Sequence, residues 1–186
     1  MKKTYLGSSI LLSSILLLGG CSETKTVQPS TVNIAQRCNA PLINYRFNSI
    51  TQGDFNTLGI KSDFVQRQLL RGLQESNCFF QPNSLIYGEY ELKIVYGTSN
   101  SYQKESHFIK TTTQDDHVIE VQISFSNFRE TRVYTGKAKA SLYHKSYFGV
   151  KDSETIFTQA EIDQTTIDAI NAAINAAIED FKKRSL

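Results

Sequence analysis

The chain has 186 residues, enough for one domain with a single hydrophobic core, and carries 20 lysines and arginines against 18 aspartates and glutamates. Two of the lysines lie in the first twenty residues, which hold no acidic residue, so the remainder balances at 18 basic against 18 acidic residues. This neutral, interspersed pattern of charge argues against nucleic acid as a partner and against adsorption to an anionic membrane surface.

Residues 1–20 have the layout of a secretory signal peptide. Lys2 and Lys3 give a positive start, an apolar run broken only by serines extends over residues 10–18, and two glycines precede Cys21. The run is shorter than the roughly 20 apolar residues that span a bilayer. A transmembrane anchor is therefore disfavoured.

The tetrapeptide Leu18-Gly19-Gly20-Cys21 resembles the lipobox of bacterial lipoproteins. The resemblance implies cleavage after Gly20 and lipidation of the Cys21 thiol. Two or more acyl chains give lasting membrane attachment, since each buried CH₂ contributes roughly 0.8 kcal/mol. Ser22 stands where Gram-negative lipoproteins retained at the inner membrane typically have aspartate. For a Gram-negative source, the expected location is the outer membrane, on its periplasmic side.

Residues 21–40 are expected to hold the lipidated cysteine and a flexible tether, because residues 22–37 are polar and show no periodicity. Cys38 and Cys78 are then the remaining thiols of an exported chain, in a compartment where disulfides persist. We expect a Cys38–Cys78 disulfide; the alternative is two buried free cysteines that act as small hydrophobic side chains. A redox enzyme is disfavoured because there is no C-x-x-C motif.

Residues 41–186 are expected to form one domain. Alternation in residues 41–50 predicts a first strand, and the apolar stripe in residues 64–76 predicts a helix that Ser62 or Asp63 can cap. Alternating apolar and polar residues predict three long strands over residues 85–97, 117–128 and 132–144. A hairpin turn at residues 127–131 is expected to join the last two.

Residues 98–117 are long and polar and are expected to form a loop, within which residues 106–112 could add an edge strand. A final helix is predicted from about Gln159 to Lys183, with an isoleucine stripe flanked by alanines. The small residues Gly136, Ala138 and Ala140 are expected to face those alanines, so that helix and sheet pack closely.

The predicted fold class is therefore α+β. We expect a two-layer sandwich with a mixed or mostly antiparallel sheet of about four to five strands and two helices on one face, in the order β-α-β-β-β-β-α.

Histidines and acids give no arrangement typical of a metal or catalytic site. His107 and His144 lie at no helical metal-ligand spacing from another ligand. Asp115 and Asp116 beside His117 come nearest to a cluster. Because adjacent strand residues point to opposite faces, Asp116 and His117 are not expected to share an ion, and an exposed turn is the preferred interpretation.

Glu89 and Glu91 share a strand face, as paired glycosidase carboxylates could, but Lys93 follows in the same row. A solvated sheet face is the preferred interpretation. The chain also has no G-x-S-x-G, no phosphate-cradling glycine loop and no H-E-x-x-H. We therefore predict that the protein is not an enzyme and has no catalytic residue, no metal and no cofactor.

Three segments carry a resemblance over roughly residues 41–182: FVQRQLLRGLQESNCFF, LIYGEYELKIVYG and VQISFSNFRETRVYTGKAKASL, followed by the alanine-rich helix. They resemble the fold of the TolB amino-terminal domain, the curli-secretion lipoprotein and the lipoproteins that activate penicillin-binding proteins. Gly88 and Gly136 stand at glycine positions of that group, and Glu130 lies in the hairpin turn. The chain lacks room for the transmembrane hairpin of the curli pore protein and has no propeller repeats.

We expect a lipid-anchored, non-enzymatic envelope protein that binds or scaffolds another envelope component, such as a cell-wall synthase, outer-membrane assembly or appendage machinery. This expectation rests on the lipobox-like tetrapeptide, the absence of a catalytic constellation, and a predicted sheet with one polar face beside a long loop. Restriction to a membrane surface raises the effective concentration toward such a partner. The alternative is an accessory lipoprotein of lipopolysaccharide or lipid transport, which an exposed apolar groove would favour. The remote alternative is a periplasmic enzyme, which a histidine hydrogen-bonded to a carboxylate in a pocket would favour.

Overall fold

The computed structural model describes residues 34–83, 89–106, 110–147, 150–151 and 156–185. The elements in chain order are β1 (Ile43–Gln52), α1 (Ser62–Ser76), β2 (Phe79–Phe80), β3 (Tyr90–Ser106), β4 (Lys110–Ser126), β5 (Thr131–Tyr147), β6 (Val150–Lys151) and α2 (Gln159–Arg184). The predicted α+β class is confirmed, and the element order matches apart from one additional two-residue strand.

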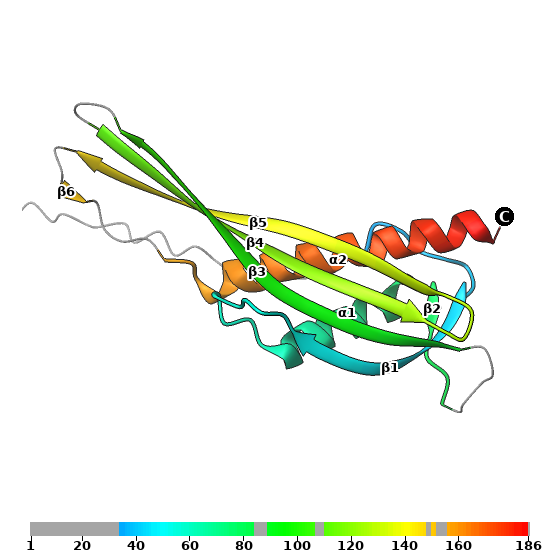
Figure 1. The fold of residues 1–186 in the computed structure, drawn as a ribbon. Coiled ribbons are helices and arrows are strands. Elements are labelled where there is room, and N and C mark those ends of the chain that lie inside the picture. The colour runs from blue at the N-terminus through cyan, green and yellow to red at the C-terminus, as the bar shows by residue number, and fades with distance from the viewer. Residues whose placement is uncertain (1–33, 84–88, 107–109, 148–149, 152–155, 186) are drawn as a thin grey trace, which may run out of the picture.

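All six strands form one sheet in the order β2-β1-β3-β4-β5-β6 (Figure 1). The sheet is mixed, because β1 runs parallel to both β2 and β3, while the pairs from β3 to β6 are antiparallel. The alternation in β3 and β4 buries Leu92, Ile94, Ile119 and Ile123 on the face that carries the helices. The other face, which we call the open face, carries residues such as Lys93 and is not covered by a helix (Figure 1).

The predicted loop over residues 98–117 is wrong, and so is the predicted edge strand at 106–112. β3 and β4 continue as partners as far as the pair Ser106 and Thr111, and β5 continues beside β4 as far as Tyr147. This part of the sheet, which we call the arm, projects beyond the start of α2 (Figure 1). The sequence has no apolar alternation here because no helix covers either face, although its β-branched threonines suit a strand.

The cap predicted for α1 is also wrong. Lys61 is the N-cap residue, and no side chain caps the helix there. Asp63 lies in the first turn instead, where a negative charge suits the helix dipole, and forms an ion pair of 2.7 Å with Arg67. The helix ends at Asn77, which has a left-handed backbone with φ 56°.

The predicted close packing of α2 on β5 is confirmed at Gly136. A Cβ atom built on Gly136 would lie 1.9 Å from the carbonyl oxygen of Ala169 and 2.5 Å from the amide nitrogen of Ala173. The helix backbone therefore rests almost directly on the strand backbone. Thr158 begins this helix with a capping box to Glu161, which sets its start firmly.

A network of ion pairs and hydrogen bonds holds the other end of α2 to the sheet. Arg132 is only 11% exposed and donates to Glu130 at 2.7 Å and to Asp180 at 2.8 Å. The Tyr134 hydroxyl donates to Asp180 at 2.7 Å, and the Tyr90 hydroxyl donates to Glu130 at 2.6 Å. Both carboxylates thus accept several hydrogen bonds, which favours their charged forms.

This network predicts acid sensitivity through Asp180. Hydrogen bonds from Tyr134, Arg184 and Arg132 lower the pKa of Asp180 from 3.8 to about 2. The unfolded chain therefore binds more protons between about pH 4 and pH 2, so the stabilisation is present above about pH 4 and is lost as the pH falls toward 2. We expect Asp180→Asn to reduce the difference in unfolding free energy between pH 7 and pH 2.5, as measured by urea denaturation.

Asp168→Asn is the matched control, because Asp168 is exposed on the same helix and forms no ion pair within the described residues. It is expected to leave that difference as in the wild type. Equal acid sensitivity of the wild type and Asp180→Asn would show that the network does not contribute to it.

Candidate functional site

A hollow of about 700 Å³ lies beside the Cys38–Cys78 disulfide, and we call it the disulfide pocket. Its volume is within the range of roughly 300–1,000 Å³ that is typical of small-molecule sites. Its walls are residues 39–41, residues of the second half of α1 together with Asn77, and residues 79–83, while Tyr45 of β1 also lines it.

Two kinds of connection hold these walls together. The predicted disulfide is present: it joins Cys38, at the start of one wall, to Cys78, between two others, with 5.0 Å between the Cα atoms. The Cys38 amide donates to the Ser76 carbonyl at 2.9 Å, and the Leu42 amide donates to the Cys78 carbonyl at 2.8 Å. Preorganised walls reduce the entropy cost of binding a ligand.

Buried aromatic residues connect the disulfide pocket to the core. Phe79 is stacked on Phe125 of β4, with 5.3 Å between ring centroids, and Tyr45 contacts the same ring edge-on at 6.2 Å. Burial raises the pKa of Tyr45 to about 12. Its hydroxyl therefore stays protonated near neutral pH, where it can donate a hydrogen bond but cannot act as a base.

Carboxamides dominate the rim. Five of the twelve lining residues are asparagine or glutamine, and all five are exposed: Asn39, Gln74, Asn77, Gln81 and Asn83. None of their side chains forms a hydrogen bond with another residue in the described part of the chain. None of the lining residues within the described ranges is Asp, Glu, Lys, Arg or His. The pocket thus offers uncharged donors and acceptors above an aromatic floor.

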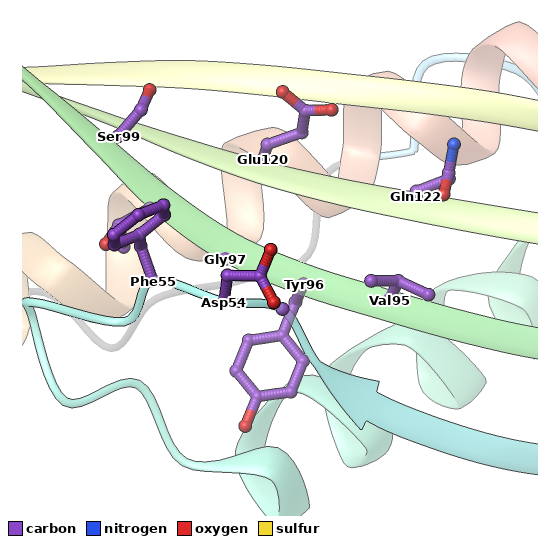
Figure 2. Close-up of a pocket in the computed structure, with 10 residues that line it drawn as sticks. Asp54, Phe55, Val95, Tyr96, Gly97, Ser99, Glu120 and Gln122 are labelled. Atoms are coloured by element: carbon purple, nitrogen blue, oxygen red, sulfur yellow. The ribbon is translucent and has the colours of Figure 1, made fainter.

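A second hollow, of about 230 Å³, lies on the open face (Figure 2). Residues 53–55, which come directly after β1, run alongside β3 there. The Gly53 amide donates to the Tyr96 carbonyl at 2.8 Å, and the Phe55 carbonyl accepts from the Thr98 amide at 2.9 Å. Gly97 permits this approach, because a Cβ atom there would lie 3.0 Å from the Phe55 carbonyl oxygen.

The side chains of this second hollow are mostly solvated. Figure 2 shows Asp54, Phe55 and Glu120 on the open face, with Tyr96 turned away from them. Phe55 is 67% exposed, and Glu120 forms an ion pair of 2.7 Å with Lys137 on β5. The hollow is thus a shallow surface with two carboxylates, one of which already has a cation.

The exposed turn predicted around His117 is wrong, because His117 lies within β4 and is 9% exposed. Its ring meets Phe157 edge-on at 5.1 Å, and its Nε2 lies 3.4 Å from the Asp115 carboxylate. Its Nδ1 is buried without a hydrogen-bond partner in the described part of the chain. A hollow of about 260 Å³ is lined by Phe157 and Leu142, but neither His117 nor Asp115 lines it.

Asp116 points away from His117, as the strand alternation predicts. Asp116 pairs with Lys139 at 2.6 Å and accepts from Gln114 at 2.8 Å. These contacts, with Ser141, lower the pKa of Asp116 to about 2. Asp116 and His117 therefore do not converge on one ion, whereas Asp115 lies beside His117.

The other predicted carboxylates lie on the open face. Glu91 accepts hydrogen bonds from Arg46 at 3.1 Å and Asn48 at 2.9 Å, and Lys93 is exposed. These contacts agree with a solvated sheet face. Glu89 lies just before β3.

Several predicted features lie outside the described residues. They are the signal peptide over residues 1–20, Cys21, the tether as far as residue 33, Gly88 and His107. For His144, the structure places the backbone within β5.

The described part of the chain shows neither a metal-binding cluster nor a membrane-spanning helix. No group of three or more His, Cys, Asp or Glu side chains there is arranged to hold a metal ion. No helix within those ranges is long and apolar enough to cross a membrane.

The sequence analysis missed the disulfide pocket. A signal was present in the run from Asn77 to Asn83, where carboxamides flank two phenylalanines and a proline. The opposite wall is nearly forty residues earlier in the chain, and it reaches this run through the disulfide and the pairing of β1 with β2. The pocket could therefore be located only in the folded chain.

No family model matches the chain, and no curated protein matches it in sequence. Among solved structures, the chain is similar to one described as a neuraminyllactose-binding hemagglutinin homologue from Helicobacter pylori, with 11% identity and a TM-score of 0.49, covering 85% of this chain and 98% of the other. It is also similar to a DUF330 family protein from Xanthomonas campestris, with 10% identity and a TM-score of 0.40, covering 84% and 95%. The function of this chain is therefore inferred from its own residues.

Proposed function

We propose that this chain is a non-enzymatic binding protein of the bacterial cell envelope, anchored through a lipid on Cys21, and that it holds another envelope component in the disulfide pocket. The observation that carries the proposal is the chemistry of that pocket. General acid–base catalysis needs a group whose pKa lies near the working pH. Among the described residues of the lining, Tyr45 has the one ionisable side chain, and its raised pKa keeps it protonated.

The position of the disulfide pocket in the chain supports the same proposal. Residues 39–41 form one wall and directly follow Cys38, so Cys21 precedes this wall by fewer than twenty residues of the sequence. The Gln36 side chain donates a hydrogen bond to Glu179 at 3.0 Å, which holds the residues before this wall against the end of α2. A lipid on Cys21 would thus keep the pocket close to the membrane and raise its effective concentration toward a component held there.

Lipid transport is less well supported by this pocket. A hydrocarbon chain bound there would cover the rim carboxamides without offering them hydrogen bonds. Leaving polar groups unpaired in this way costs about 1–3 kcal/mol for each one that is fully desolvated.

Cys21→Ala is expected to abolish lipid attachment, because only the thiol can form the thioether. The variant should incorporate no labelled palmitate and should leave the membrane fraction or remain unprocessed, as judged by fractionation and intact mass. Ser22→Ala is the control and should remain lipidated and membrane-bound. Normal palmitate labelling of Cys21→Ala would contradict the proposed anchor.

The binding site can be tested by photo-crosslinking from the lipidated chain in its native envelope. Phe80 in the disulfide pocket and Val133 on the open face are each 50% exposed, so a benzophenone side chain at either position is comparably accessible. Benzophenone inserts into C–H bonds, so it captures proteins, saccharides and lipids alike. We expect a discrete adduct from position 80 and none from position 133.

Asn77→Gly introduced beside the benzophenone should reduce that adduct. Glycine accepts the left-handed backbone that Asn77 adopts and removes only its carboxamide. Equal adducts from both positions, or none from position 80, would contradict binding in this pocket.

A further inference from the structure

We propose that the ligand of the disulfide pocket is a neutral saccharide. This inference rests on the proposed function and names the chemical class of its ligand. It is carried by three properties of the lining: the absence of charge, the unpaired carboxamides, and the aromatic surfaces among them.

The uncharged lining selects against an ionic ligand. Charged residues make up 20% of the chain, yet none of the twelve lining residues that the structure describes is Asp, Glu, Lys or Arg. An anion or cation entering the pocket would lose water without gaining an opposite charge, which is unfavourable. A ligand without net charge avoids this cost.

The rim carboxamides match the needs of hydroxyl groups. A hydroxyl donates one hydrogen bond and accepts others, and a carboxamide supplies both an acceptor oxygen and two donor hydrogens. The five rim carboxamides form no side-chain hydrogen bond within the described part of the chain, so they are available to a ligand rich in hydroxyls.

The aromatic residues complete the match. A sugar ring carries polar hydroxyls around its edge and C–H groups on its faces, and these faces pack against aromatic rings. Phe80 is 50% exposed beside Gln81, and Phe79 and Tyr45 lie buried below. An apolar ring next to a carboxamide is the pairing that a sugar ring requires.

A peptide added to the edge of the sheet is less well supported. Strand addition gains affinity from a row of backbone hydrogen bonds along an exposed edge. The edge at this pocket is β2, which has two residues, Phe79 and Phe80. So short an edge offers few backbone groups, whereas side-chain carboxamides are plentiful.

The test is a calorimetric titration of the full-length lipidated chain in nanodiscs. The probes are two neutral trisaccharides, triacetylchitotriose and maltotriose, and the anionic trigalacturonic acid. We expect at least one neutral trisaccharide to bind and trigalacturonic acid to bind at least tenfold more weakly.

Two variants place that binding in the disulfide pocket. Gln81→Ala and Asn77→Gly are each expected to weaken it about three- to tenfold, the effect of losing one uncharged hydrogen bond. Gln103→Ala, an exposed carboxamide on the arm, is the control and should leave the affinity unchanged. Unchanged melting temperatures will show that the variants fold.

Failure to bind either neutral trisaccharide, equal binding of the anion, or equal loss in Gln103→Ala would overturn the saccharide assignment. A polypeptide adduct from position 80 together with no saccharide binding would reject the ligand class and leave the proposed function standing. Loss of both the adduct and the saccharide binding would reject both proposals.

Discussion

Gly136→Ala is expected to lower the free energy of unfolding by about 3 kcal/mol, at the upper end of the usual cost of overpacking. The added methyl group would lie 1.9 Å from the carbonyl oxygen of Ala169 and 2.5 Å from the amide nitrogen of Ala173. Both are backbone atoms of α2, so no side chain can rotate away and the helix itself must move off β5. Urea denaturation of the wild type and the variant measures the loss.

Gly53→Ala is the matched control for this substitution. A Cβ atom there would have the Tyr96 carbonyl oxygen as its nearest neighbour at 3.4 Å, an ordinary van der Waals contact. The change is expected to alter stability by less than about 1 kcal/mol. Similar losses at Gly136 and Gly53 would mean that close contact of α2 with β5 is not what Gly136 provides.

Removal of the disulfide by Cys38→Ala together with Cys78→Ala is expected to cost about 4 kcal/mol of unfolding free energy. The bond closes a sequence separation of 40 residues, and without it the unfolded chain regains the corresponding freedom. The loss is measured by urea denaturation under non-reducing conditions. The same substitutions should weaken trisaccharide binding, because the 39–41 wall would be held to the rest of the pocket mainly by backbone hydrogen bonds.

Reduction provides the control for the disulfide prediction. A reductant should destabilise the wild type by a similar amount and leave the double variant unchanged. Two freely alkylated thiols at positions 38 and 78 in the exported native protein would contradict the bond itself, and non-reducing peptide mass spectrometry distinguishes these results.

Strong local patterns allowed much of the fold to be predicted. The isoleucine stripe of α2 and the alternation in residues 117–126 and 132–142 each identify an element, because a buried face repeats with the period of its backbone. Gly136 and the alanines of α2 indicated close packing because small residues are what such packing requires. Each of these patterns lies within one segment of the sequence, or in two segments whose small residues match each other, so it can be recognised without the structure.

The arm shows where such patterns end. Residues 98–117 lack alternation, so they indicated a loop. Residues 98–106 are nevertheless strand, paired with β4, and residues 110–117 are strand, paired with both β3 and β5. A strand without a covering helix needs no apolar face. Its backbone hydrogen bonds form whatever the polarity of its side chains, so the pattern of side chains does not reveal them. The burial of His117 was also not predicted, because the residue that covers it, Phe157, lies forty residues later in the chain.

The sequence alone determined the signal-like leader, the lipobox-like tetrapeptide ending at Cys21, the two thiols expected to pair and the α+β class. These depend on residue type, short spacing and periodicity, which the linear chain displays directly. Only the tertiary structure decided where the arm projects and that a pocket lies beside the disulfide. Its carboxamides and aromatic rings come from segments that are far apart in the chain, and long-range pairing of β1 with β2 and of Cys38 with Cys78 brings them onto one surface.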